Sequence, residues 1–249
     1  MNEVILELKD LNFSNYDKVV FDNVNVELRR DTLTCVLAES GGGSSSLLKI
    51  MAGLILPTSG KVLFKNKEIH SINKKLLFSL RKQFSFVFQN SALISNLSIG
   101  ENVMLPLNFH FPKMRSKEKK AKTEEALGLA GIADQFNMRP AQISQGKQKM
   151  AAIVRALITK PEMVFFDEPF GGLDPTMRRS AEKIIIEYSD LPETTVVLST
   201  YSKYMILNKS DKILYIENGS VTTFERENHE ENYDPEVVSK RLIKDIIFS

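Results

Sequence analysis

The chain is poor in the residues and runs that would place it in several common classes of protein. Only one residue is cysteine, which excludes a disulfide within the chain, and Cys35 lies in an apolar run where burial is expected. The longest apolar runs, such as Ile50–Pro57, fall short of the roughly 18 to 20 residues that a membrane-spanning helix needs. The first residues, Met1-Asn2-Glu3, lack the charged and apolar pattern of an export signal. We therefore expect a cytoplasmic protein.

The chain also lacks a strong excess of charge of either sign. Its 33 basic and 31 acidic residues leave a net charge of +2, which gives no indication of nucleic acid binding. With 43% hydrophobic and 26% charged residues among 249, the composition is that of a globular protein with one sizeable core or two modest ones. There is no internal repeat and no low-complexity linker.

Short apolar or alternating runs predict strands in the first and last thirds of the chain, with a helical stretch between them. The predicted strands are 4–11, 19–28, 34–37, 61–64, 84–88, 163–167, 195–200 and 212–217. Helices are expected after the glycines near residue 43, through much of 90–160, and at 176–188. Because strands alternate with helices, we expect an α/β fold whose parallel sheet binds ligands at the carboxyl ends of its strands.

A glycine loop between a predicted strand and a predicted helix indicates a phosphate-binding site. In such loops, glycines let successive backbone N–H groups converge on an anion at a helix N-terminus, and a lysine adds positive charge. Here the position of the lysine holds Ser44, while Ser45 stands where a hydroxyl would ligate Mg²⁺. The candidate phosphate-binding residues are Ser40, Gly41, Gly42, Gly43, Ser44, Ser45 and Ser46. The alternative is a Gly/Ser-rich turn with no ligand.

A second candidate site lies where the apolar strand 163–167 ends in two acids, Asp167 and Glu168. We expect both carboxylates to be exposed, with Asp167 holding the water shell of a metal ion and Glu168 polarising an attacking water. Acids after strands also occur as helix caps, which is the alternative interpretation. The position of this pair far downstream of a glycine loop favours the first interpretation.

These ordered motifs resemble those of the nucleotide-binding subunits of ABC transporters. The resemblance implies that Phe13 stacks on adenine, although an aromatic residue at a strand edge is more often part of a core. Gln89 falls at the glutamine loop, which touches the metal or its water. Ser144 and Gly146 fall in the signature loop, which binds the γ-phosphate on the opposite subunit, and Asp174 falls at a loop that contacts the dimer partner.

The resemblance also implies a fold and a set of cofactors. It implies a P-loop ATPase fold of the ABC type over residues 1–225, with a parallel-sheet core, an antiparallel β subdomain and a helical subdomain at about 90–160. Residues 226–249 would form a tail with a short amphipathic helix, packed on its own domain or, alternatively, docked on a partner. The cofactors would be ATP and Mg²⁺, and the implied metal ligands are Ser45, Gln89 and Asp167.

The local sequence around Gln89, Glu101 and Phe166 is most similar to that of the ATPases of the Mla and MCE lipid-trafficking systems. That similarity implies transport of phospholipid or another hydrophobic cargo. The implied partners are transmembrane permease subunits and a second ATP-binding subunit, either a second copy or a different chain. The protein would then lie on the cytoplasmic face of the inner membrane and touch the membrane only through its partners.

The sequence departs from the family pattern in the ATP site. Besides Ser44, Ala38 replaces the first loop glycine, and Tyr201 stands at the position of the switch histidine, a catalytic position in the family. Gln145 and Lys147 alter the signature loop. Lys147 either restores positive charge at the nucleotide of the partner subunit or is a solvated lysine at a helix start. None of the three histidines of the chain can occupy the switch position by sequence order: His70, His110 and His229.

Loss of the lysine removes a stabilising charge from the transferring phosphoryl group. Removing one such group costs on the order of 3 to 4 kcal/mol, or roughly two to three decades in rate. We therefore expect hydrolysis to be weak or lost, although Glu168, Gln89 and Asp167 are retained. The alternatives are a catalytically active homodimer that drives the same kind of transport and a soluble ABC protein without membrane subunits.

Basic residues cluster between 113 and 122, interleaved with acids. Such a run either touches anionic lipid headgroups or forms a solvated helix face, and the interleaved acids favour the second interpretation.

Overall fold

The computed structural model describes residues 3–16, 18–39, 41–70 and 74–226. The described residues form two compact units, of which the first lies within residues 3–70 and 195–226 and the second comprises residues 74–194. The predicted amphipathic helix of the tail lies outside the described residues. No helix in the described part of the chain is long and apolar enough to span a membrane.

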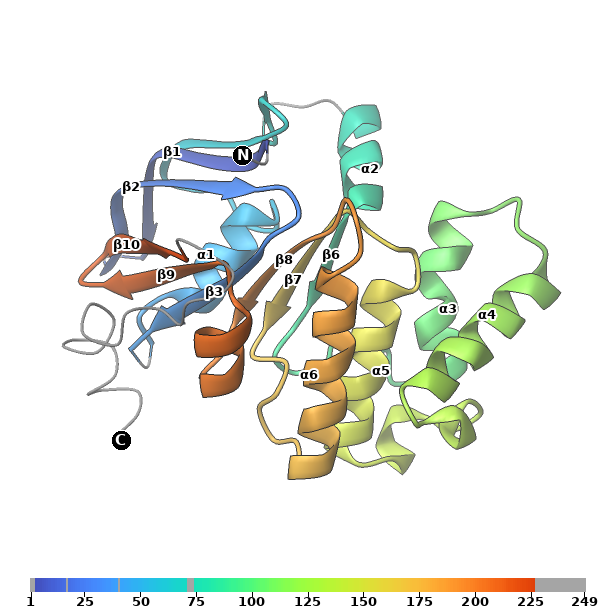
Figure 1. The fold of residues 1–249 in the computed structure, drawn as a ribbon. Coiled ribbons are helices and arrows are strands. Elements are labelled where there is room, and N and C mark those ends of the chain that lie inside the picture. The colour runs from blue at the N-terminus through green and yellow to red at the C-terminus, as the bar shows by residue number, and fades with distance from the viewer. Residues whose placement is uncertain (1–2, 17, 40, 71–73, 227–249) are drawn as a thin grey trace. The chain divides into compact units, whose positions relative to one another are not determined.

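An antiparallel sheet forms one part of the first unit (Figure 1). Its strands, in spatial order, are β2 (Lys18–Arg29), β1 (Val4–Asn15), β4 (Ser59–Phe64) and β5 (Lys67–Glu68). Apolar residues on one face are buried, among them Leu6 and Leu8 in β1 and Val24 and Val26 in β2. This alternation is typical of a sheet with one covered face.

A mixed sheet forms the other part of the first unit. β3 (Leu33–Ala38) pairs in parallel with β8 (Thr195–Ser199) and with β9 (Lys212–Glu217), and β10 (Ser220–Glu225) forms an antiparallel hairpin with β9. Every residue of β3 and β8 is buried, as expected for central parallel strands. Helix α1 (Ser44–Met51) packs against both strands (Figure 1), and its apolar residues Leu47, Leu48, Ile50 and Met51 are buried.

The cysteine lies in β3 and is fully buried, as predicted. Burial raises the pKa of the Cys35 thiol to about 12, so the thiol is neutral at ordinary pH and has the character of a small apolar residue.

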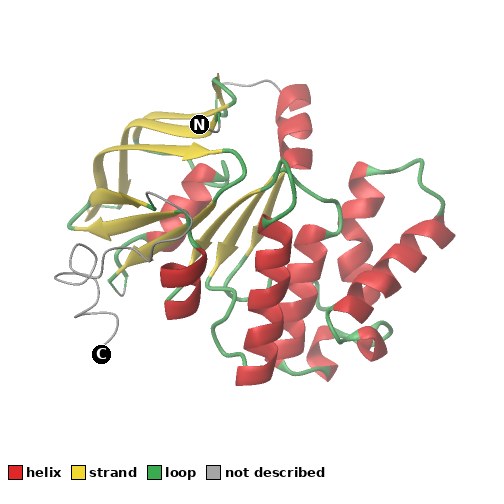
Figure 2. Ribbon diagram, viewed as in Figure 1, coloured by secondary structure: helices red, strands yellow, loops and turns green. Residues whose placement is uncertain are grey.

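Helices dominate the second unit, as the red ribbons of Figure 2 show. Its two strands, β6 (Phe84–Val87) and β7 (Met163–Asp167), pair in parallel. The α-helices are α2 (Lys74–Gln83), α3 (Ile99–His110), α4 (Ser116–Leu129), α5 (Gln145–Leu157) and α6 (Pro175–Ser189), and short 3-10 turns occur at Ala133–Gln135 and Pro140–Gln142. Helix α5 packs against α3, α6 and β6.

The α/β class is confirmed, and so are the antiparallel sheet and the helical stretch between residues 90 and 160. Helix α2 was not predicted, and the helix expected at 176–188 extends by one residue at each end. The basic residues at 113–122 are exposed, as expected of a solvated face, except for Lys119, which is buried and donates from Nζ to Asn108 Oδ1 at 3.1 Å.

Candidate functional site

The predicted phosphate loop joins β3 to α1 in the first unit. Gly41 and Gly43 have positive φ angles of 76° and 105°, and Gly43 is the residue that precedes α1. The N–H of Gly42 donates to the carbonyl of Glu39 at 2.7 Å, which closes a tight turn. Ser40 lies outside the described residues. Two of the three loop glycines therefore have backbone conformations that favour glycine, whereas convergence of the loop N–H groups on an anion stays a prediction.

Close packing against β2 gives Gly43 a second reason to lack a side chain. A Cβ at this position would lie 2.8 Å from Val20 Cγ1 and 3.0 Å from Phe21 Cζ. At Gly41, by contrast, a Cβ would meet nothing within 4 Å. The start of α1 is thus fixed against β2, while Gly41 has open space around it.

The N-terminus of α1 can attract an anion through its backbone and its serine hydroxyls but not through a cationic side chain. Its first turn is Ser44-Ser45-Ser46, so it carries hydroxyl groups and no cation. The aligned peptide dipoles still make a helix N-terminus favourable for phosphate. Ala38, which replaces a glycine, lies buried within β3 and does not have a positive φ, so its Cβ introduces no backbone strain.

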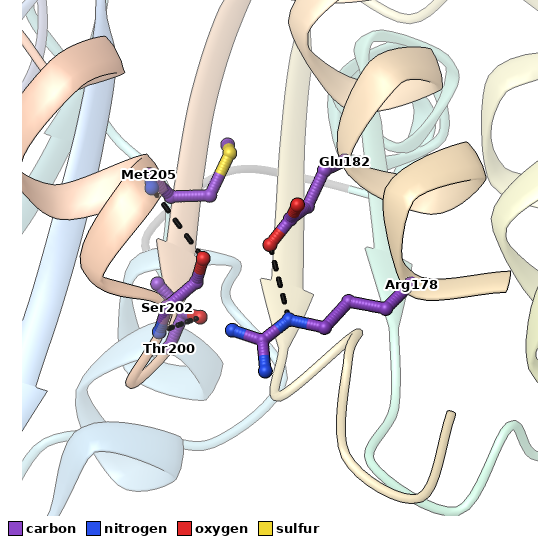
Figure 3. Close-up of polar contacts among 5 residues, drawn as sticks. All are labelled: Arg178, Glu182, Thr200, Ser202 and Met205. Atoms are coloured by element: carbon purple, nitrogen blue, oxygen red, sulfur yellow. Dashed lines mark hydrogen bonds and ion pairs between the residues drawn. The ribbon is translucent and has the colours of Figure 1, made fainter. Parts of the chain in front are cut away.

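Tyr201, the residue at the switch position, is bound to the start of this loop. Its hydroxyl donates to the carbonyl of Ala38 at 2.9 Å, while about half of the residue is exposed. The turn that carries it is fixed by two further bonds: the N–H of Ser202 donates to Thr200 Oγ1 at 3.0 Å, and the N–H of Met205 donates to Ser202 Oγ at 3.4 Å (Figure 3). In this conformation the tyrosine hydroxyl is engaged by the protein backbone.

Phe13, the predicted adenine-stacking residue, is half-buried on β1. Its ring centroid lies 6.3 Å from that of Phe21, the same residue that crowds Gly43. The two rings therefore form a small aromatic pair beside the loop, and stacking on adenine stays a prediction.

The second unit carries the acidic part of the predicted site, at the carboxyl end of β7. The expectation that both acids are exposed is wrong for Asp167, which is 2% exposed, whereas Glu168 is partly exposed. Gln89, which follows β6, donates from Nε2 to Glu168 Oε2 at 3.0 Å. The structure thus joins two predicted residues that are far apart in the sequence.

Glu168 has a strained backbone. Its φ angle is 45°, and the next residue is Pro169. A left-handed conformation costs a residue with a side chain roughly 1 to 3 kcal/mol and persists only where the surroundings impose it. A residue before proline also prefers extended conformations, which adds to the strain.

Sequence reasoning missed a residue at this site, Lys149 of α5. Its Nζ donates to the carbonyl oxygen of Glu168 at 3.0 Å, and the residue is buried. Burial lowers the pKa of Lys149 below its ordinary value, an effect that the nearby charges of Glu168 and Asp167 partly offset. A signal was present: Lys149 shares a helix face with Ala152 and Ile153, so a lysine interrupts an apolar stripe.

Two more predicted residues lie at helix starts in the second unit. Ser144 Oγ accepts from the N–H of Lys147 at 3.3 Å and caps α5. Asp174 caps α6 by accepting from the N–H groups of Thr176 and Met177 at 2.9 and 3.0 Å. Their roles toward a nucleotide stay predictions.

Lys147, another candidate, forms an ion pair with Asp134 and is only partly exposed. Its Nζ lies 3.8 Å from Asp134 Oδ2, and its side chain is about one-third exposed. Gly146 packs against α6, since a Cβ there would lie 2.6 Å from Met177 Sδ. Helix α6 carries its own ion pair, in which Arg178 Nε donates to Glu182 Oε1 at 3.1 Å (Figure 3).

The predicted metal ligands are divided between the units: Ser45 belongs to the first, and Gln89 and Asp167 to the second. A hydroxyl, an amide and a carboxylate are oxygen donors of the kind that Mg²⁺ prefers, so the donor chemistry fits this ion. Within the described ranges there is no cluster of three or more His, Cys, Asp or Glu residues that could hold a metal. A magnesium that keeps most of its water and phosphate ligands needs no such cluster.

Comparison with known proteins places these features in one family. A family model described as ABC transporter matches residues 21–171, a range that includes the glycine loop and both acids. The chain belongs to the ABC transporter family. It is 30% identical over 213 residues to the intermembrane phospholipid transport system ATP-binding protein MlaF of Haemophilus influenzae, covering 85% of this chain and 80% of that one.

Other members of the ABC transporter family are similarly close. The glycine betaine/carnitine transport ATP-binding protein GbuA of Listeria monocytogenes is 36% identical over 188 residues, which cover 75% of this chain and 47% of GbuA. Among solved structures, a dimeric ATP-binding cassette in a post-hydrolysis state, bound to ADP and Pi, superimposes with a TM-score of 0.81. It is 26% identical, and the match covers 89% of this chain and 98% of that one. The resemblance inferred from the sequence is confirmed.

Proposed function

We propose that this chain is the ATP-binding subunit of a transport complex and that its own hydrolysis of ATP is weak or lost. One observation carries the proposal: the loop before α1 keeps the glycine backbone of a phosphate site, while Ser44 stands where the cation would be. ATP and Mg²⁺ are the proposed ligands. A second ATP-binding subunit, identical or different, and transmembrane permease subunits are the proposed partners.

In this proposal the N–H groups at the start of α1 bind the phosphates through the helix dipole. Ser45, Gln89 and Asp167 are the residues that would hold the magnesium, and Glu168 would polarise water. When bound, Mg²⁺ supplies positive charge that neutralises the outer phosphates. Ser44 adds no charge to that of the metal, so the developing charge of the transition state is stabilised less than in an intact site.

Tyr201 supports the same conclusion. A switch residue should present a polar group to the γ-phosphate, but the hydroxyl of Tyr201 donates to the carbonyl of Ala38. A phenol also does not gain and lose a proton near neutral pH as an imidazole does.

An active homodimeric ATPase remains the second candidate, and a specific observation favours it. Glu168 is held through its carboxylate by Gln89 and through its carbonyl by Lys149, although its backbone is strained. Strain that is held in place by several bonds is typical of a working site.

The cargo that we propose is phospholipid or another hydrophobic molecule. The relationship to MlaF supports this cargo, as does the local sequence around Gln89 and Phe166. Identity alone does not select this cargo, because GbuA is similarly related. The proposed location is the cytoplasmic face of the inner membrane, reached through the permease subunits.

Phosphate release by the purified chain, alone and with its membrane partner, tests the mechanism. We expect slow release, and binding of Mg-ATP in calorimetry that is weaker than micromolar. Robust turnover that disappears in Glu168→Gln would instead establish the active ATPase. Tight binding of Mg-ATP that disappears in Asp167→Ala would contradict a weak site.

Reconstitution tests the cargo separately. The complex in vesicles should transfer a fluorescent phospholipid in an ATP-dependent manner and leave glycine betaine untransported. The reverse result would replace the proposed cargo with a small polar solute.

A further inference from the structure

Two cationic side chains of α5 donate hydrogen bonds to backbone carbonyls of residues that have positive φ angles. Lys149 donates to the carbonyl of Glu168 at 3.0 Å, and Glu168 has φ 45°. Arg155 donates from its two terminal nitrogens to the carbonyls of Ser91 and Ala92, both at 2.8 Å, and these residues have φ 64° and 43°. All five residues belong to the second unit.

This arrangement fixes both partners of the bond between Gln89 and Glu168. Gln89 lies just before the strained turn that Arg155 holds, and Glu168 is the strained residue that Lys149 holds. One helix therefore anchors the loop after β6 and the loop after β7, and both anchors are charge-assisted hydrogen bonds.

Lys149 is an unexpected residue for its position. It occupies the buried stripe of α5 with Ala152 and Ile153, where an apolar side chain would avoid the desolvation of an ammonium group. Within the described residues its one hydrogen bond is to Glu168. Gly171 lies beside both groups, because a Cβ there would lie 3.9 Å from Lys149 Nζ and 3.8 Å from Glu168 Oε2.

We propose that Lys149 is a positioning residue that holds the Glu168 backbone in its left-handed conformation. The Glu168 carboxylate then stays hydrogen-bonded to Gln89 and faces the site of the attacking water. The role of Glu168 toward that water rests on the proposed function, whereas the hold on its backbone does not. Lys149 therefore acts through Glu168 and makes no contact with a reacting atom.

Nuclear magnetic resonance of the full chain tests the hold without requiring hydrolysis. We expect Lys149→Met, which keeps the length of the side chain and removes its donors, to shift the carbonyl carbon of Glu168 and the side-chain amide of Gln89. Lys149→Arg, which keeps a charged donor, should leave both signals near their wild-type positions. Lys183→Met is the matched control, because Lys183 is an exposed lysine on α6 of the same unit.

A Lys149→Met protein that is folded and shows both signals unchanged would overturn the proposal, and so would equal shifts in the control. A second measurement needs only the wild type, in case the variant does not fold. The Lys149 ammonium should give a resolved nitrogen signal with a correlation through the hydrogen bond to the carbonyl carbon of Glu168. A rapidly exchanging ammonium without that correlation would overturn the proposal independently.

Turnover separates this inference from the proposed function. If the wild type hydrolyses ATP, Lys149→Met should lower kcat roughly 10- to 100-fold with KM little changed, because a misplaced group affects the chemical step more than binding. Lys149→Arg should recover most of that loss, and a Lys149→Met protein with unchanged kcat would overturn the inference. A wild type without turnover would support weak hydrolysis and leave the resonance measurements to decide on Lys149.

Discussion

The loop before α1 and the loops after β6 and β7 hold left-handed backbone in opposite ways. Before α1, the positive φ angles belong to Gly41 and Gly43, which adopt them without a steric penalty. After β6 and β7 they belong to Ser91, Ala92 and Glu168, and cations of α5 hold the carbonyls of these residues.

The difference concerns charge as much as conformation. The glycine loop keeps its shape without a cation, so the loss of the lysine at position 44 leaves the backbone intact. The loops after β6 and β7 depend on Arg155 and Lys149 for their shape, so the loss of either cation would change the geometry itself. A phosphate loop of this kind can lose the cation that stabilises charge on a phosphate and still keep its backbone conformation.

Adding charge to the glycine loop should have the largest effect. Ser44→Lys restores a cation at the start of α1, and we expect ATP turnover to rise roughly 100- to 1000-fold. Phosphate release at saturating Mg-ATP measures it. Ser44→Met, which adds length without charge, should give no such rise. An unchanged rate in Ser44→Lys would show that another departure, such as Tyr201, limits the site.

Removing the glycine freedom of this loop should have the next largest effect. Gly43→Ala combines a positive φ with a clash against Val20 and Phe21, so we expect a loss on the order of 3 kcal/mol in the free energy of unfolding. Gly41→Ala, where the space is open, should cost about 1 kcal/mol. Urea denaturation of both variants checks the order, and equal losses would contradict the role assigned to β2.

Removing Arg155, the cation of α5 that holds the loop after β6, should lower the free energy of unfolding by somewhat less. Arg155→Met deletes two charge-assisted bonds to the carbonyls of Ser91 and Ala92, and we expect a loss of about 2 to 3 kcal/mol in the free energy of unfolding. Hydrogen exchange near residue 91 should rise more than exchange in β7. Arg179→Met, an exposed arginine on α6, should change stability by less than about 0.5 kcal/mol. Uniform loss of protection would contradict a local hold.

The smallest predicted effect concerns the segment that follows Gln89 and leads into α3. The N–H of Ser98 donates to the Glu101 carboxylate at 2.7 Å, and this bond lowers the pKa of Glu101. Because the folded pKa lies below the unfolded value, this stabilisation is complete above that value and is lost as the pH falls through the folded pKa. Glu101→Gln should therefore lose less of its Tm between pH 7 and pH 3 than the wild type. Identical acid dependence would contradict this.

Local sequence patterns predicted the parts of the fold that depend on neighbouring residues. Glycines after an apolar strand gave the loop before α1, and the alternation of Val24 and Val26 with polar residues gave β2. Ser144 and Asp174 cap α5 and α6, a role that their position before helical patterns was able to indicate but that the sequence interpretation did not assign to them. These features follow from side-chain spacing alone.

Features that depend on long-range contacts could not be predicted in this way. The bond of Tyr201 to Ala38 joins residues 163 positions apart, and that of Lys149 to Glu168 joins different elements. The burial of Asp167 likewise depends on what packs around the end of β7. A single sequence shows that a lysine interrupts an apolar stripe, but it does not show which carbonyl that lysine reaches.

The tight turn at Gly42 has a consequence for the kinetics of nucleotide capture. In the resting loop the N–H of Gly42 already donates to the carbonyl of Glu39, so an arriving phosphate would have to displace that carbonyl to use this amide. Association should then include an isomerisation of the loop, and the observed rate should level off as the nucleotide concentration rises.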